Sequence, residues 1–205
     1  MPRKRLIRTA DYPYHVTIRS NNKEWFDLDM QLVWKICLNS LSVANSKYPA
    51  SIHAFVLMNN HYHLMISTPQ SNIDKFMFEL NRNISWQMRA KSGRVNRIFG
   101  DRYKWSLVTS DRYLKNVVRY TYQNPLRGQL VERCEDYKFS TLYHQQNDLR
   151  LPFEIIHAFN YGEEASFLAW VNMNISEDEQ SALKKGLSKP EFKLPKDVSR
   201  RVLSH

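Results

Sequence analysis

Two histidines in the segment NNHYHLMIS, residues 59–67, have the spacing of a pair of metal ligands. Alternate residues of a β-strand project to the same face, so a strand here would present His61 and His63 side by side. Two adjacent imidazoles can bind one divalent cation. Because the chain has 7 histidines in 205 residues, the same spacing is expected by chance in roughly 0.2 of chains of this composition. The pair therefore needs a third ligand.

A predicted helix over residues 111–123 supplies candidates for a third ligand and a nucleophile. At about 100° per residue, one stripe of this helix carries Tyr113, Val117, Tyr120 and Asn124. Tyr120 and Asn124 are four residues apart, a spacing that lets a phenolic oxygen and an amide oxygen approach one metal-bound phosphate. Without the histidines, Tyr120 would be interpreted as a core aromatic. A second stripe would anchor the helix: Leu114, Val118 and Tyr122.

The elements that position these residues follow from the hydrophobic periodicity. Four segments are predicted to be strands: 14–19, 51–58, 61–67 and 102–109. Asn59-Asn60 suits the tight turn of a hairpin between the second and third strands. Two further helices are predicted, one capped by Asp27 or Asp29 and ending near Tyr48, the other capped by Ser71 or Asn72 and extending through Met88. Pro125 should end the helix that carries Tyr120.

The order β, α, β, β, α, β, α predicts an α+β fold. Such an order suits an antiparallel sheet of the ferredoxin-like, split β-α-β kind, with the helices packed on one face. Beyond residue 130 the periodicity weakens. EIIHAF is a possible short element, EASFLAWVNM and SEDEQSALKKG are predicted to be helices, and KPEFKLPKDVSRRVLSH is predicted to be a mobile tail.

The composition favours a nucleic acid as the partner. Lys and Arg number 30 against 20 Asp and Glu, which gives a net charge of +10 and a pI of about 9.6. Cys37 and Cys134 have neither disulfide-framework nor zinc-ribbon spacing, which fits a reducing cytoplasm. The basic start MPRKRLIR has no apolar segment after it, and no stretch approaches the roughly 18 apolar residues of a membrane span. We therefore expect a soluble cytoplasmic protein without a membrane partner.

The second predicted helix carries a candidate nucleic-acid surface. Arg82, Trp86 and Arg89 recur at i, i+4 and i+7, so the indole could stack a base while the guanidinium groups contact phosphates. The alternative interpretation is a solvated helix face with a partly buried tryptophan.

Three segments together resemble the single-tyrosine HUH transposases, in particular the REP-associated tyrosine transposases. They are NNHYHLMIS, RIFGDRYKWSLVTSDRYLKNVVRYTYQNPLRGQLV and CEDYKFSTLYH. The likeness extends from about residue 5 to about residue 160, and its most specific parts are the His-hydrophobic-His strand and the Tyr-x-x-x-Asn-Pro helix end. The resemblance implies an RRM-like antiparallel sheet. We therefore expect an HUH-type catalytic domain over residues 1–130 and a mainly helical C-terminal extension over 131–205.

The resemblance implies a role for each candidate residue, when the roles of the family's motif residues are transferred to the matching positions of this sequence. His61 and His63 would bind the metal, Tyr120 would be the nucleophile, and Asn124 would complete the metal site. Many relatives have Gln at that last position, so Gln123 is the alternative third ligand. The family implies Mg²⁺ or Mn²⁺, whereas imidazole ligation by itself would also suit Zn²⁺.

The resemblance also implies the reaction and the substrate. The tyrosine would attack a phosphodiester of single-stranded or hairpin DNA, giving a 5′-phosphotyrosine and a free 3′-hydroxyl. One phosphodiester is exchanged for another, so ATP is not needed. Basic residues near the site could hold the DNA backbone, although for each one singly a solubilising surface charge is the commoner role: Arg102, Lys104, Arg112, Arg119 and Arg127. Some single-tyrosine relatives act as dimers and others as monomers, so a homodimer is a further expectation.

Two other functions are consistent with parts of the sequence. A non-catalytic protein that binds single-stranded or hairpin nucleic acid would keep the Arg82, Trp86 and Arg89 stripe but could lose Tyr120 or a histidine. A zinc hydrolase is weaker, because the strand motif lacks a helical His-x-x-x-His and a nearby carboxylate base.

Overall fold

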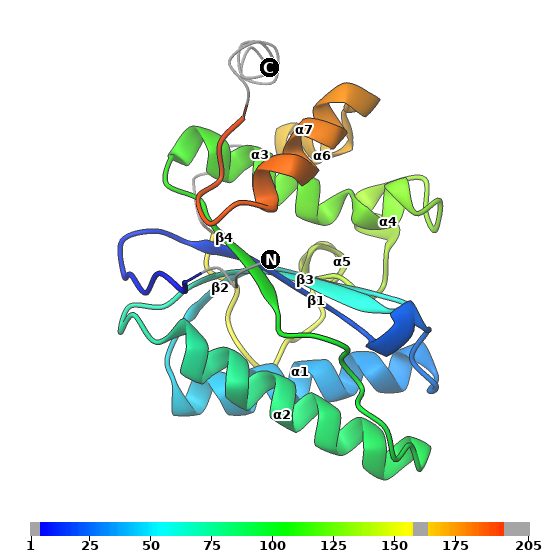
Figure 1. Cartoon of the computed structure of the whole chain (residues 1–205). Helices are drawn as coiled ribbons and strands as arrows, with labels where there is room; N and C mark the ends of the chain where they lie inside the picture. The colour runs from blue at the N-terminus through cyan, green and yellow to red at the C-terminus, as the bar shows by residue number, and fades with distance from the viewer. Residues whose placement is uncertain (1–4, 158–163, 195–205) are drawn as a thin grey trace.

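A computed structural model describes residues 5–157 and 164–194 (Figure 1). Its centre is a four-stranded antiparallel sheet in the order β2-β3-β1-β4. The strands are β1 (Tyr14–Arg19), β2 (Ser51–Met58), β3 (His61–Ser67) and β4 (Lys104–Leu107). The predicted α+β class and the antiparallel sheet are confirmed.

Helices cover both faces of this sheet. The two long helices α1 (Met30–Lys47) and α2 (Ile73–Ser92) lie on one face, and α3 (Asp111–Tyr122) lies on the other (Figure 1). The prediction that the helices pack on one face therefore holds for α1 and α2 and is wrong for α3. The reason is that β2 is apolar on both sides. Phe55 and Leu57 join the core beneath α1 and α2, whereas Val56 and Met58 join the core beneath α3.

The first three strands have the predicted limits, and β4 is shorter than predicted. Its ladder with β1 runs from Thr17 opposite Lys104 to Tyr14 opposite Leu107. Val108 still donates to the carbonyl of Pro13 at 2.9 Å, but Pro13 has no N–H with which to continue the ladder. The strand therefore ends there.

The helix ends follow the local chemistry. The cap of α1 is Asp29, whose Oδ1 accepts from the backbone N–H groups of Gln31 at 2.9 Å and Leu32 at 3.2 Å. Asn72 occupies the N-terminal cap position of α2 without a side-chain cap bond. The C-terminal cap after Ser92 is Gly93, whose φ of 68° is left-handed. Helix α3 ends at Tyr122, and a single further turn, α4 (Asn124–Arg127), starts with Pro125 in its first turn.

The C-terminal segment returns to the sheet. Short elements η2 (Cys134–Asp136) and α5 (Thr141–Gln146) lead to the two predicted helices, which are present as α6 (Glu164–Asn172) and α7 (Glu177–Leu187). Of EIIHAF, Ile155 makes a parallel bridge with Ile52, and residues 158–159 lie outside the described part.

The start of the predicted tail is packed against β4, because the N–H of Leu107 donates to the carbonyl of Pro190 and the N–H of Phe192 to that of Leu107, both at 2.8 Å. Residues 195–205 of that tail lie outside the described part of the chain. The proposed boundary at residue 130 stays a prediction. Among the described helices, none has the length and apolar character to cross a membrane.

Candidate active site

The two candidate metal ligands lie on the sheet face that α3 covers. In the antiparallel pairing of β1 with β3, Thr17 is opposite His63 and Arg19 is opposite His61. The rings of His61 and His63 have centroids 5.1 Å apart, as the same-face geometry of a strand predicts. The side chains of β1 that share this face are therefore neighbours of the pair.

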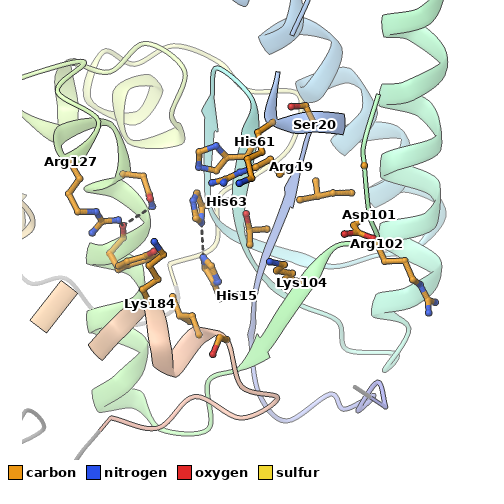
Figure 2. Close-up of a pocket in the computed structure, with 18 of the residues that line it drawn as sticks. His15, Arg19, Ser20, His61, His63, Asp101, Arg102, Lys104, Arg127 and Lys184 are labelled. Atoms are coloured by element: carbon orange, nitrogen blue, oxygen red, sulfur yellow. Dashed lines mark hydrogen bonds between the residues drawn. The ribbon is translucent and has the colours of Figure 1, made fainter. Parts of the chain in front are cut away.

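A third histidine, which the sequence did not single out, contacts the pair. Nε2 of His15 is 3.0 Å from Nδ1 of His63, and the two ring centroids are 5.1 Å apart (Figure 2). The only indication in the sequence is the alternation of His15, Thr17 and Arg19 in YHVTIR. That alternation becomes informative only when the partner strand and its register are known.

Burial keeps these imidazoles neutral. Desolvation lowers the pKa of His15 to about 3, with a smaller contribution from the charge of Arg127. Desolvation and the charge of Arg19 lower the pKa of His61 to about 4. The pKa of His63 is also well below the usual value, through desolvation and the neighbouring His15 and His61. A neutral imidazole is the form that binds a metal.

The lowered pKa values predict a loss of stability below neutral pH. The unfolded chain takes up protons below a histidine pKa of about 6.5, whereas folded His15 does not, so the free energy of unfolding should fall as the pH drops from 6.5. His15 alone corresponds to about 2 kcal/mol between pH 7 and pH 5. Urea denaturation at the two pH values measures the difference. A His15→Gln variant should lose less over this range, and equal losses would contradict the assignment.

Tyr120 is the tyrosine that α3 brings to the histidines. Its ring centroid is 6.0 Å from those of His15 and His63, nearly perpendicular to both. The guanidinium carbon of Arg127 lies 4.0 Å from the centroid of the Tyr120 ring, and Nη2 of Arg127 donates to the Tyr120 carbonyl at 2.9 Å. Burial raises the pKa of Tyr120, while the charges of Arg127 and Arg19 act in the opposite direction.

The other two tyrosines of α3 point elsewhere. The hydroxyl of Tyr122 is 3.1 Å from Oγ1 of Thr141 in the core, as predicted for its stripe. The ring of Tyr113 packs edge-on against Phe192, with centroids 5.2 Å apart.

Of the two candidate amides, Asn124 is the one at the cavity. Its side-chain N–H groups donate to the carbonyls of Tyr120 at 2.9 Å and Thr121 at 3.1 Å, so Oδ1 is the amide atom left to accept or to ligate. Gln123 is buried on the other side and donates to the carbonyls of Val171 and Met173, both at 2.8 Å. This arrangement favours Asn124 over Gln123 as the third ligand.

The donor set fits a divalent cation with open coordination positions. Nδ1 of His61 donates to Oδ1 of Asn60 at 2.7 Å and Nδ1 of His63 contacts His15, which leaves Nε2 of each ring for a ligand. Outer hydrogen bonds of this kind orient metal-binding histidines. Within residues 5–157 and 164–194, no three His, Cys, Asp or Glu side chains are arranged to hold a metal. A cation here would use Asn124, water and substrate oxygens as its further ligands.

These groups line one positively charged cavity of about 1130 Å³. It contains His15, His61, His63, Tyr120 and Asn124. Six of the lining side chains are cations and two, Asp101 and Glu177, are carboxylates. The cations are Arg19, Lys23, Arg102, Lys104, Arg127 and Lys184. The predicted residues Arg102, Lys104 and Arg127 are thus brought together with the histidines, and Arg19, Lys23 and Lys184 are additions that the sequence did not indicate.

Other predicted contacts are not at the cavity. Arg119 is 5% exposed, and its guanidinium carbon lies 5.3 Å from the ring centroid of Trp170 on α6. The prediction that Arg119 holds the DNA backbone is therefore wrong, because this position on α3 faces α6 and the cation is covered. Arg112 is exposed in the first turn of α3 and is not among the lining residues.

The stripe on α2 lies across the sheet from the cavity. Trp86 is 65% exposed, which is compatible both with a base-stacking surface and with the alternative of a solvated helix face. Arg82 pairs with Glu79 at 2.7 Å, and Arg89 is exposed. DNA held by this stripe would be on the opposite face from Tyr120.

Comparison with known proteins places this chain in a family. No curated protein matches the chain. Among solved structures, the chain is similar to a REP-associated tyrosine transposase bound to a REP hairpin, with a TM-score of 0.60 and 22% identity over 80% of this chain and 98% of that one. It is also similar to a putative transposase from Deinococcus radiodurans R1, with a TM-score of 0.40 and 16% identity over 58% of this chain and 93% of that one. The first likeness shows the fold. The family model described as IS200-like transposase matches residues 9–124, more than half of the sequence, and the chain therefore belongs to the IS200-like transposase family.

Proposed function

We propose that this protein is a metal-dependent transesterase that cleaves and rejoins hairpin-flanked single-stranded DNA through a 5′-phosphotyrosine on Tyr120. The observation that carries the proposal is the position of Tyr120, whose ring centroid is 6.0 Å from that of His63 in the cavity that also contains His61 and Asn124. Transposases cut and join DNA, and this arrangement supports a phenol as the attacking group.

The reaction conserves the number of phosphodiester bonds. Oη of Tyr120 forms a bond to phosphorus, the bond from phosphorus to the 3′ oxygen breaks, and that oxygen takes up a proton to become a 3′-hydroxyl. Attack by a 3′-hydroxyl on the phosphotyrosine reverses the exchange and releases the phenol. Burial raises the pKa of Tyr120 above its ordinary value, so the phenol is protonated at neutral pH. Arg127, stacked on the ring, and Arg19 stabilise the negative charge that develops as the proton leaves for solvent.

His61, His63 and Asn124 would hold the divalent cation. A bound Mg²⁺ or Mn²⁺ would polarise the phosphate and stabilise its developing charge. The protein's own contribution is to keep Nε2 of both histidines neutral and oriented, through Asn60 and His15. Tyr120 is a neighbour of both histidines within the single chain that the structure describes. The expected homodimer stays a prediction.

A denaturing gel tests the proposed function directly. The full chain is incubated with single-stranded hairpin oligonucleotides and Mg²⁺, and the products are examined for a covalent protein–DNA species. We expect such a species with Mg²⁺ and none with EDTA. If no hairpin in a varied panel yields an adduct while the chain binds these DNAs, the protein is the non-catalytic binder. The exposed stripe on α2, remote from Tyr120, is the feature that favours this second function.

The form of the DNA should decide affinity. Single-stranded or hairpin DNA is expected to bind more tightly than a blunt duplex. Phosphates would bind the cavity cations on one face of the sheet, and only unpaired bases could stack on Trp86 at the separate surface of α2 on the other face. Binding should also weaken steeply with salt, since phosphate contacts release counterions. Fluorescence anisotropy at several salt concentrations measures both effects.

Trp86→Ala tests the stacking part of this prediction, because it removes an exposed side chain that does not line the cavity. It should weaken single-strand binding by about 1–3 kcal/mol if one base stacks on the indole. A duplex that binds as tightly as the single strand at every salt concentration would contradict the proposed substrate.

A further inference from the structure

One wall of the cavity comes from a helix to which the family match assigns nothing. The match ends at residue 124, yet Gln180, Ser181 and Lys184 of α7 line the same cavity as His61 and Tyr120. The described C-terminal segment is thus part of the surroundings of the candidate nucleophile.

The position of α7 is fixed by apolar packing. Leu183 is fully buried and belongs to the same apolar cluster as Val117 and Tyr120 of α3. Gly186 lies so close to Phe192 that a β-carbon would be 2.7 Å from its ring, so this contact requires glycine. Ser176 and Glu179 form a capping box that stabilises the start of the helix.

The segment after α7 ties the helix to the sheet. Leu107 of β4 exchanges backbone hydrogen bonds of 2.8 Å with Pro190 and Phe192, and it bridges Glu191 in parallel. The same strand carries Lys104, which lines the cavity. Helix α7 is therefore held at both α3 and β4, and a side chain on its exposed side has a defined place relative to the histidines.

Two adjacent lysines on α7 differ in where they point. Lys184 and Lys185 are both exposed, but only Lys184 lines the cavity, because consecutive helical residues are about 100° apart. In Figure 2, Lys184 and Arg127 lie on one side of the histidines, and Lys104 and Arg102 lie on the other. A strand that crosses the histidines would have cations along both of its edges.

We propose that α7 is part of the DNA-binding surface of this site, and that Lys184 binds a backbone phosphate of the substrate strand. The proposal rests on the proposed function. A single strand fits the charge of the cavity, in which six cations outnumber two carboxylates. A flexible, strongly hydrated ammonium binds phosphate as a point charge without reading sequence. Lys184 is therefore assigned to affinity and to the path of the strand, while the chemistry stays with Tyr120.

The test compares Lys184→Ala with Lys185→Ala in the full chain, each combined with Tyr120→Phe so that the DNA stays intact. Affinity for a single-stranded hairpin oligonucleotide is measured by fluorescence anisotropy from low to moderate salt. Loss of one phosphate contact on a single strand should reduce the slope of log K against log salt by about 0.7. It should also weaken binding at low salt on the order of five-fold. Lys185→Ala makes the same change in net charge, and it should leave the salt slope and the affinity equal to those of the Tyr120→Phe chain.

The salt slope separates a direct contact from a general effect. If Lys184→Ala and the parent have the same slope, or if Lys185→Ala lowers the slope equally, the assignment of Lys184 is overturned. Formation of the covalent adduct by the unmodified chain is tested in parallel, so the proposed function can stand when this inference fails. A chain that binds no single-stranded DNA would overturn both.

Discussion

Replacing Tyr120 with Phe is expected to abolish the covalent protein–DNA species completely while the fold and the DNA affinity are kept. The substitution removes one oxygen from a side chain that is 9% exposed, and the ring contacts with His15, His63 and Arg127 do not involve that oxygen. Without a nucleophilic oxygen no bond to phosphorus can form. The measurement is a denaturing gel with a labelled hairpin, alongside thermal unfolding and a binding isotherm.

The two other tyrosines of α3 are the matched controls. Tyr113→Phe removes an oxygen from a ring that packs on Phe192 and should leave the adduct yield unchanged. Tyr122→Phe loses a buried hydrogen bond to Thr141 and should cost about 1 kcal/mol of stability without loss of the adduct. Peptide mapping of the trapped adduct identifies the modified residue. A phosphotyrosyl peptide with Tyr113 or Tyr122 in place of Tyr120 would overturn the assignment.

Replacing His61 or His63 with Ala should reduce cleavage by more than about 100-fold, because charge stabilisation at the phosphate is lost. His61→Ala is the cleaner change, since His61 is only half-buried, whereas loss of His63 leaves buried His15 without its ring partner. Calorimetric titration with Mn²⁺ gives a readout that does not depend on cleavage, and both variants should bind the ion more weakly than the unmodified chain.

His157 provides the control for this pair. It is exposed and is not among the residues that line the cavity, so His157→Ala should alter neither cleavage nor Mn²⁺ affinity. Circular dichroism checks that the variants are folded. Full cleavage by the double variant of His61 and His63, or an unchanged affinity for Mn²⁺, would show that the histidines do not hold the cation.

The sequence by itself determined the features that depend on local periodicity. The limits of β1, β2 and β3 agree with those predicted. The reason is that the two-residue alternation of side chains in a strand can be recognised from a few consecutive residues. The same rule placed His61 beside His63, and the helical period put Tyr120 and Asn124 on one stripe. The family can likewise be recognised from the sequence, because the family model matches one continuous range of residues, 9–124.

Only the tertiary structure decided which distant residues meet. The contact of His15 with His63 depends on the register between β1 and β3, and register is a property of two strands together. Arg119 was predicted to hold the DNA backbone, but Trp170 on α6 covers it.

The position of α3 opposite α1 and α2 placed the Trp86 stripe on the far side of the sheet from Tyr120. The return of α7 to α3 placed Lys184 at the histidines. Such contacts depend on how apolar faces pair across the whole chain, and the local periodicity that predicts an element does not specify its partner.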